Sequence, residues 1–274
     1  MSNPIFDLRP THNPHRWLLP ITEKICVGRK TSPFMLGGVG LAASVTALEQ
    51  TSGRPVVWAT AQYLSFGRPP AIVDLDVSIP INGAFTTQGR VIAHVADQEI
   101  LTVVAALGER PSVGEGLWVE APDAPPPELC RQAFAPDDEI AGILETLDVR
   151  IVQGRFRSEQ LDGTPSPDGR MLLWIRPRKA PPRDTGSLAV IADYLPSAVC
   201  HALGKFVYAT SLDNTLRMIR LVQTEWILCD MHIVAAHGGF AHGSLRMFSF
   251  EGELMAVGSQ SMILRAKAPM QAIA

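Results

Sequence analysis

The segment GVGLAASVTALEQ, residues 38–50, determines how the rest of the chain folds. It is predicted to form a helix that is apolar on nearly every face, and such a helix must be buried on most sides. The charge-free run around it, Thr31–Leu48, is about as long as the ~18 residues that suggest a membrane-spanning helix. Because Pro33, three glycines and several hydroxyl residues interrupt that run, we interpret the helix as the centre of a protein core.

Four predicted strands follow the helix and can surround it. They are rich in β-branched and aromatic residues, or they alternate apolar with polar residues, as half-buried strands do. Turn signals at Asn82-Gly83 and Asp97-Gln98 separate the later strands. The predicted strands are Val56–Phe66, Ala71–Ile81, Phe85–Val95 and Ile100–Leu107. One buried helix followed by strands with short turns predicts an antiparallel sheet of the α+β class.

The second half of the chain repeats this order. DQEILTVVAAL, residues 97–107, aligns without a gap with EGELMAVGSQS, residues 251–261, at an offset of 154 residues. A repeat this long indicates two copies of a small domain. The elements predicted here are helices at Asp137–Thr146 and Ser187–Gly204, and strands at Leu147–Arg155, Met171–Arg176, Phe206–Arg217, Trp226–Val234, Phe240–Phe250 and Leu254–Leu264. We therefore predict a tandem (double) hot-dog fold, in which each half is a long helix wrapped by a curved antiparallel β-sheet.

A proline-rich stretch separates the two halves. Six prolines between Pro111 and Pro136 favour extended or irregular backbone. We expect an N-terminal hot-dog domain over 1–110, a connector over 111–146 and a C-terminal hot-dog domain over 147–274 that carries the active site. Edge strands at the ends of the fused domains favour a homo-oligomer.

Composition and charge exclude several classes of function. Hydrophobic residues make up 46% of the chain, which is typical of a folded protein. The 24 Lys and Arg residues against 27 Asp and Glu leave a net charge of −3, so no basic field for nucleic acid is expected. The four cysteines form no CxxC pair and the N-terminus does not resemble an export signal, so we expect free thiols, a cytoplasmic location and no membrane partner.

Several motifs resemble one known family, the acyl-CoA thioesterase II type of double hot-dog thioesterases. FMLGGVGLAASVTALEQ (34–50) resembles the family's Phe-Gly-Gly helix start, and TSLDNTLRMIR (210–220) is similar to its Ser-Leu-Asp-His strand. EWILCD (225–230) and GELMAVGSQSMILR (252–265) resemble two further family motifs in the same order. The resemblance covers nearly the whole chain and implies hydrolysis of fatty or related acyl-CoA, within lipid metabolism, to free acid and CoA.

The resemblance also implies which residues hold the attacking water. Asp213 matches the family's Asp and would act as the general base. Gln260 matches the family's Gln and would orient the water without adding charge. The position equivalent to Gln260 in the first half is Ala106, so we expect a single active site, on the second half.

Two further groups are expected near these residues. The family's Ser or Thr would fall at Ile233, Val234 or Ala235, none of which has a hydroxyl, so the enzyme is expected to be slow unless Ser211, Thr215 or Ser259 replaces it. Backbone N–H groups at the start of the first helix, at Gly38, would polarise the thioester carbonyl.

Three alternatives stay open. The missing hydroxyl favours a noncatalytic acyl-CoA-binding protein of the same fold. Hot-dog folds also host dehydratases, for which His201 is the nearest candidate base. Arg176, Arg178 and Lys179 are interpreted as a solvated loop or, less favourably, as contacts to the CoA phosphates. No metal is expected, because His232, His237 and His242 straddle a predicted hairpin. No cofactor is expected, because GGVG at 37–40 is not a dinucleotide-binding motif. The absence of GxSxG also gives no support to an α/β-hydrolase.

Overall fold

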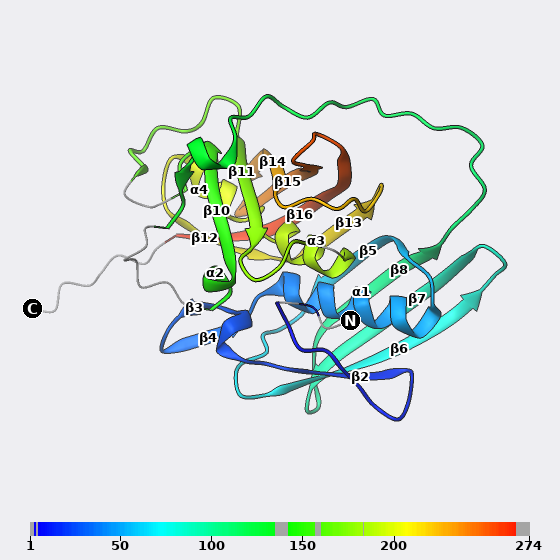
Figure 1. The fold of residues 1–274 in the computed structure, drawn as a ribbon. Helices are drawn as coiled ribbons and strands as arrows, with labels where there is room; N and C mark the ends of the chain where they lie inside the picture. Colours follow the sequence, from blue (N-terminus) through cyan, green and yellow to red (C-terminus); the bar gives the residue numbers. More distant parts are fainter. Residues whose placement is uncertain (1–2, 4, 135–141, 157–159, 183, 267–274) are drawn as a thin grey trace, which may run out of the picture.

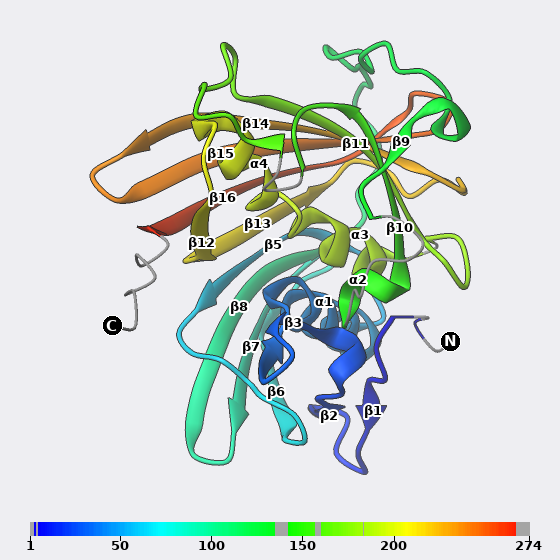
Figure 2. The ribbon, with the colours of Figure 1, turned by 90° about the vertical axis from the view of Figure 1, so that its left-hand side faces the viewer.

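The computed structural model describes residues 3, 5–134, 142–156, 160–182 and 184–266. Within these residues, fourteen strands form one continuous antiparallel sheet, which curves around the helices α1 and α3 (Figures 1 and 2). The strand order is β1-β2-β6-β7-β8-β5-β13-β16-β15-β14-β11-β10-β9, with β12 pairing beside β16. A large apolar core, drawn from both halves, fills the space between the sheet and the helices.

The first half confirms the predicted central helix and its four strands. Helix α1 spans Gly37–Ser52 and ends at Gly53, whose φ of 69° is the left-handed conformation that favours glycine at a helix end. The strands of the large sheet in this half are β1 (Arg9–Pro10), β2 (Arg16–Pro20), β5 (Val56–Tyr63), β6 (Ile72–Asn82), β7 (Thr86–Val95) and β8 (Gln98–Gly108). The short 3-10 helix η1 (Glu23–Ile25) leads into a separate hairpin of β3 (Cys26–Arg29) and β4 (Ser32–Met35).

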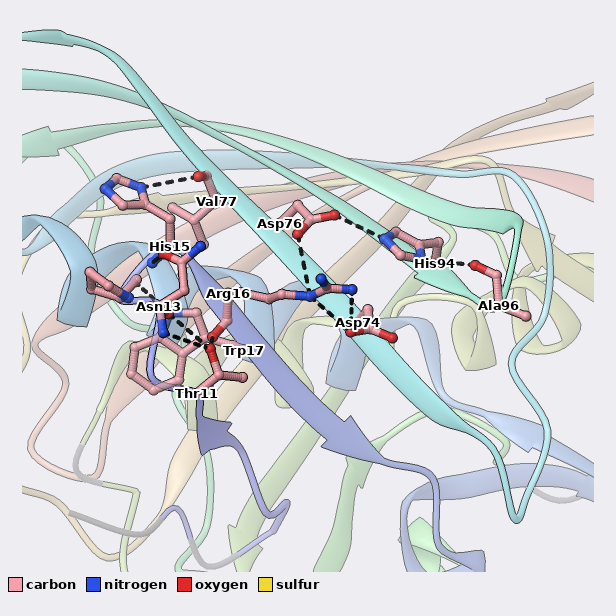
Figure 3. A network of polar contacts seen from close by, with 11 residues as sticks. Thr11, Asn13, His15, Arg16, Trp17, Asp74, Asp76, Val77, His94 and Ala96 are labelled. Atoms are coloured by element: carbon pink, nitrogen blue, oxygen red, sulfur yellow. Dashed lines mark hydrogen bonds and ion pairs between the residues drawn. The ribbon is translucent and has the colours of Figure 1, made fainter.

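The sequence pattern does not predict β2, which pairs with β6 at the side of the sheet. The Arg16 side chain donates to Asp74 at 3.0 Å and lies 3.8 Å from Asp76. His94 of β7 bonds the second oxygen of Asp76 at 2.9 Å (Figure 3). The hydrogen bond with Asp76 raises the pKa of His94. Polar contacts therefore hold three strands together on this outer face.

The second half contains most of the predicted strands in the predicted order. Its elements are η2 (Pro127–Leu129), β9 (Arg131–Gln132), α2 (Ile143–Thr146), β10 (Leu147–Gln153), β11 (Arg170–Pro177), α3 (Thr185–Ala192), α4 (Ser197–Leu203), β12 (Val207–Ser211), β13 (Asp213–Met218), β14 (Ile227–His237), β15 (Phe240–Ser249) and β16 (Leu254–Ala266). The helix predicted over Asp137–Thr146 is described only at Ile143–Thr146, since residues 135–141 lie outside the described residues.

Two predicted elements of the second half are each broken in two. The single helix expected over Ser187–Gly204 is α3 and α4, separated at Asp193–Pro196, because Pro196 has no N–H to continue a helix. The description of a long helix in each half is therefore wrong for the second half. The strand expected over Phe206–Arg217 breaks at Leu212, whose N–H donates to Ser261 of β16 and whose carbonyl accepts from Tyr63 of β5.

The two halves meet along β5 and β13, and the seam has the symmetry of a duplicated domain. Thr60 pairs with Thr215 and Ala61 pairs with Asn214. With the 154-residue offset between the two halves, Thr60 corresponds to Asn214 and Thr215 corresponds to Ala61. The offset therefore converts the first pair into the second. The two threonine hydroxyls lie 3.0 Å apart across the seam. Helices α1 and α3 lie side by side (Figure 1). Gly38 at the start of α1 bonds to Asp193 after the end of α3, and Thr185 at the start of α3 bonds to Glu49 near the end of α1, so the helices run in opposite directions.

One helical stretch among the described residues, Thr185–Leu203, is long and apolar enough to cross a membrane by length and composition alone. In this structure 72% of that stretch is buried inside the protein.

Candidate active site

A cavity of about 230 Å³ opens where the two halves meet. Its walls come from the β3–β4 hairpin, the start of α1, the end of β5, the break between α3 and α4, and β12. Seven of the lining residues are apolar: Val27, Phe34, Met35, Leu36, Phe66, Pro196 and Ala209. The other lining residues are Gly37, Tyr63, Ser65, Asp193, Thr210 and Ser211.

Asp193 is the buried charge of this cavity. It follows the last residue of α3, and only 7% of it is exposed. Its Oδ2 accepts the backbone N–H of Gly38 at 2.6 Å. Helix α1 has no side-chain cap of its own at Leu36, so Asp193 supplies the missing acceptor from the other half. Burial raises the pKa of Asp193 to about 6, although the bonds from Gly38 and Gln260 act in the opposite direction.

Gln260 connects Asp193 to a hydroxyl. It lies on β16 and is 3% exposed. Its Nε2 donates to Asp193 Oδ1 at 2.5 Å and to Ser211 Oγ at 2.9 Å. Asn214 also approaches Asp193 Oδ1, at 3.5 Å. The Oε1 atom of Gln260 is buried and has no hydrogen-bond partner among the described residues, so it is a free acceptor beside the carboxylate.

The structure brings some of the predicted site residues together and separates others. Gln260 and Ser211 meet, but Gln260 bonds to Asp193 and not to Asp213. The Asp213 carboxylate instead accepts the backbone N–H of Ser261 at 2.7 Å, within the sheet. Thr215 bonds to Thr60 at the seam. The N–H of Gly38, expected to face the substrate carbonyl, points at Asp193.

Sequence reasoning missed Asp193, although a signal was present. It is a charged residue inside SLAVIADYLPSAV (187–199), a stretch predicted as a buried helix. An acidic residue is almost never fully buried unless it is paired or functional. Of the three hydroxyls expected as replacements for the family's Ser or Thr, Ser211 lies beside Gln260.

The first half does not repeat this trio of Asp193, Ser211 and Gln260. With the 154-residue offset, Ser211 corresponds to Val57 and Gln260 to Ala106. A larger cavity of about 820 Å³, lined in part by Val57 and Thr185, lies at the other end of the helix pair. The trio thus occurs once among the described residues, and its cavity also takes Gly37 and Tyr63 from the first half.

Three of the histidines considered as a catalytic base or as metal ligands bond to groups outside the trio of Asp193, Ser211 and Gln260. In His201, Nδ1 accepts from the Arg155 N–H at 3.3 Å and Nε2 bonds the Arg170 carbonyl at 3.0 Å. Burial lowers the pKa of His201. His232 and His242 bond to different partners, the Asp168 carbonyl and the Ser261 hydroxyl. Among the described residues, no group of three His, Cys, Asp or Glu side chains is placed to hold a metal ion.

The basic segment predicted as a solvated loop begins within β11. Arg176 lies 3.7 Å from Asp148, forms an ion pair with Glu225 and stacks over Trp226. Arg176 is not among the residues that line the cavity.

This architecture, one curved antiparallel sheet around paired helices with a buried carboxylate between the halves, defines a protein of the hot-dog fold. Residues 117–264 match the family model for the acyl-CoA thioesterase C-terminal domain. The chain belongs to the acyl-CoA thioesterase family.

Solved structures agree with this assignment. A protein from Novosphingobium aromaticivorans DSM 12444, described as a candidate thioesterase, is 30% identical with a TM-score of 0.83, over 94% of this chain and 98% of that one. Acyl-CoA thioesterase II TesB2 from Mycobacterium marinum is 23% identical with a TM-score of 0.75, over 97% and 98%. A hot-dog protein of unknown function from Alicyclobacillus acidocaldarius is 18% identical with a TM-score of 0.80, over 95% and 96%. No curated protein matches the sequence significantly.

Proposed function

We propose that this protein hydrolyses acyl-CoA thioesters to a free acid and CoA, with Asp193 as the general base. The observation that carries the proposal is the buried Asp193 carboxylate, with its pKa raised to about 6, bonded to Gln260 in the wall of a cavity. A base with a pKa near the working pH is both ionised and able to take a proton. Asp193 thus takes the role that the sequence resemblance suggested for Asp213.

The proposed reaction uses one water molecule. Asp193 removes a proton from the water while the water oxygen forms a bond to the thioester carbonyl carbon. The Ser211 hydroxyl, which belongs to the cavity lining, would hold that water, and the Gln260 amide nitrogen would hold Ser211 and Asp193 in place. The C–S bond then breaks, the electron pair leaves with sulfur, and the proton on Asp193 passes to the CoA thiolate. Atoms and charge balance without a cofactor.

The size of the cavity supports a preference for short acyl groups. Its volume of about 230 Å³ is below the roughly 300–1,000 Å³ of typical ligand pockets. Phe34 and Phe66 form a closed aromatic pair, with ring centroids 5.1 Å apart, in the apolar wall. We expect the rate of hydrolysis to fall as the acyl chain lengthens.

The test is release of the free CoA thiol from a series of acyl-CoAs of increasing chain length. Turnover by the wild-type protein, fastest with short chains, is the expected result. Saturable binding of acyl-CoA without thiol release would contradict hydrolysis and favour the noncatalytic binder. Asp213→Asn is expected to stay within a few-fold of wild type, because Asp213 bonds to the sheet backbone and not to the trio. Loss of turnover in that variant would return the base to Asp213.

The pH dependence is a separate prediction. Asp193 must be ionised to accept a proton, and its pKa is raised to about 6. We expect kcat/KM to be constant above about pH 7 and to fall about tenfold per pH unit below pH 6. The measurement is a pH profile of kcat/KM in buffers of constant ionic strength. An acid limb near pH 4 would show that the base is a carboxyl in water and not the buried Asp193.

A further inference from the structure

A thioester hydrolase needs hydrogen-bond donors at the carbonyl oxygen, where negative charge develops. The donors nearest to Asp193 are already engaged. The N–H of Gly38 bonds to Asp193, and the amide nitrogen of Gln260 donates to Asp193 and Ser211. These groups hold the base, so the substrate carbonyl needs another donor.

Tyr63 is a further donor among the residues that line the cavity. It is the last residue of β5, and its backbone N–H bonds to Leu212 at the break between β12 and β13. Tyr63 is one of the residues that line the cavity, together with Asp193 and Ser211. Its hydroxyl oxygen is buried, no group among the described residues accepts its proton, and the Asn214 amide is a polar group near it. Burying a hydroxyl whose proton has no acceptor is unfavourable, so this arrangement requires an explanation.

The ring of Tyr63 lies close to the catalytic carboxylate. Gly37 makes this possible, since a Cβ there would be 2.9 Å from Tyr63 Cζ and 3.2 Å from Asp193 Oδ2. The phenol carbon and the carboxylate therefore approach the same point beside the start of α1. Gly37 is the first helical residue of α1, a position where N–H groups have no intrahelical partner.

The electrostatic surroundings keep this hydroxyl protonated. Burial, followed by the nearby charge of Asp193, raises the pKa of Tyr63 well above its ordinary value of 10.0, although the Asn214 amide acts in the opposite direction. Tyr63 is therefore a hydrogen-bond donor throughout the working pH range and does not compete with Asp193 as a base.

We propose that the Tyr63 hydroxyl donates a hydrogen bond to the thioester carbonyl oxygen and stabilises the oxyanion formed when water attacks. The first half of the chain thus supplies the electrophilic group, and the second half supplies the base. The inference rests on the proposed thioester hydrolysis, and it deepens that proposal by assigning a further catalytic residue.

The test compares Tyr63→Phe with a matched control, Tyr194→Phe. Tyr194 also has a buried hydroxyl without a partner among the described residues, but it does not line the cavity. We expect Tyr63→Phe to lower kcat by about 10²–10³, the usual effect of removing one oxyanion donor, with a smaller change in KM. The acid limb near pH 6 should stay in place, and Tyr194→Phe should keep wild-type kcat.

A second measurement does not depend on turnover. A ketone analogue of acyl-CoA, with CH₂ in place of the thioester sulfur, is bound to both proteins and its carbonyl stretch is recorded by infrared spectroscopy. A hydrogen bond from Tyr63 lowers this frequency in the wild type relative to Tyr63→Phe. Equal frequencies, or kcat within threefold of wild type in a folded Tyr63→Phe, would overturn the inference. Failure of the wild type to release thiol would overturn the proposed function separately.

Discussion

Replacing Asp193 by Asn is expected to lower kcat by about 10²–10⁴ without unfolding the protein. The substitution removes the group that accepts the proton of the attacking water. The amide oxygen of Asn can still accept the N–H of Gly38, and Gln260 can turn its free Oε1 toward the new amide. Thiol release from short acyl-CoAs measures the loss, and circular dichroism checks that the fold is retained.

The stability of this variant gives an independent check on the buried charge. The pKa of Asp193 is raised from 3.8 to about 6. Between pH 3.8 and about pH 6, the folded protein therefore keeps a proton on Asp193 that the unfolded chain has lost. Stability from this group therefore falls as pH rises through that window, by about 3 kcal/mol in total, and stays lower above pH 6. The Asn variant lacks this penalty.

We measure the melting temperature of Asp193→Asn minus that of wild type at each pH. This difference is expected to be more positive at pH 8 than at pH 4. A variant that keeps full activity, or a stability difference that does not depend on pH, would remove Asp193 as the buried base.

Gly38→Ala is expected to disable the site by moving α1. A Cβ at residue 38 would lie 2.6 Å from Asp193 Cβ and 3.1 Å from the carbonyl oxygens of Ala189 and Val190. Backbone atoms of α3 cannot turn aside, so the start of α1 must shift away. We expect a loss of stability of about 1–3 kcal/mol and a fall in kcat of at least tenfold.

The same change has a second consequence for Asp193. The hydrogen bond from Gly38 favours the ionised carboxylate. Weakening that bond should raise the pKa of Asp193 further and move the acid limb of the activity profile to higher pH. Urea unfolding and a pH profile measure the two effects.

Gly40→Ala is the matched control on the same helix. Its added Cβ would meet the far end of the Leu101 side chain, which can rotate, and it does not contact Asp193. We expect Gly40→Ala to keep the acid limb of wild type. If Gly38→Ala behaves in the same way as Gly40→Ala, the close approach of α1 to Asp193 has no role in activity.

The architecture was largely predictable because burial leaves a local pattern. The apolar segment at 38–50 forms α1, and the alternating stretches that follow form β5 to β8. The 154-residue offset between the two halves reappears in the pairing of β5 with β13. Hydrophobic periodicity carries this information, since each residue's burial depends mainly on its own element.

The sequence alone determined the antiparallel α+β architecture, the internal repeat and the family, and it pointed to Gln260 and Ser211. Only the tertiary structure decided which carboxylate joins them. Asp193 and Gly38 are 155 residues apart in sequence, and Asp193 becomes the cap of α1 only when the two halves pack. Its raised pKa is a property of that burial, which no local pattern encodes. The approach of the Tyr63 ring to Asp193 likewise depends on the packing of the two halves, since Tyr63 ends β5 of one half and Asp193 follows α3 of the other.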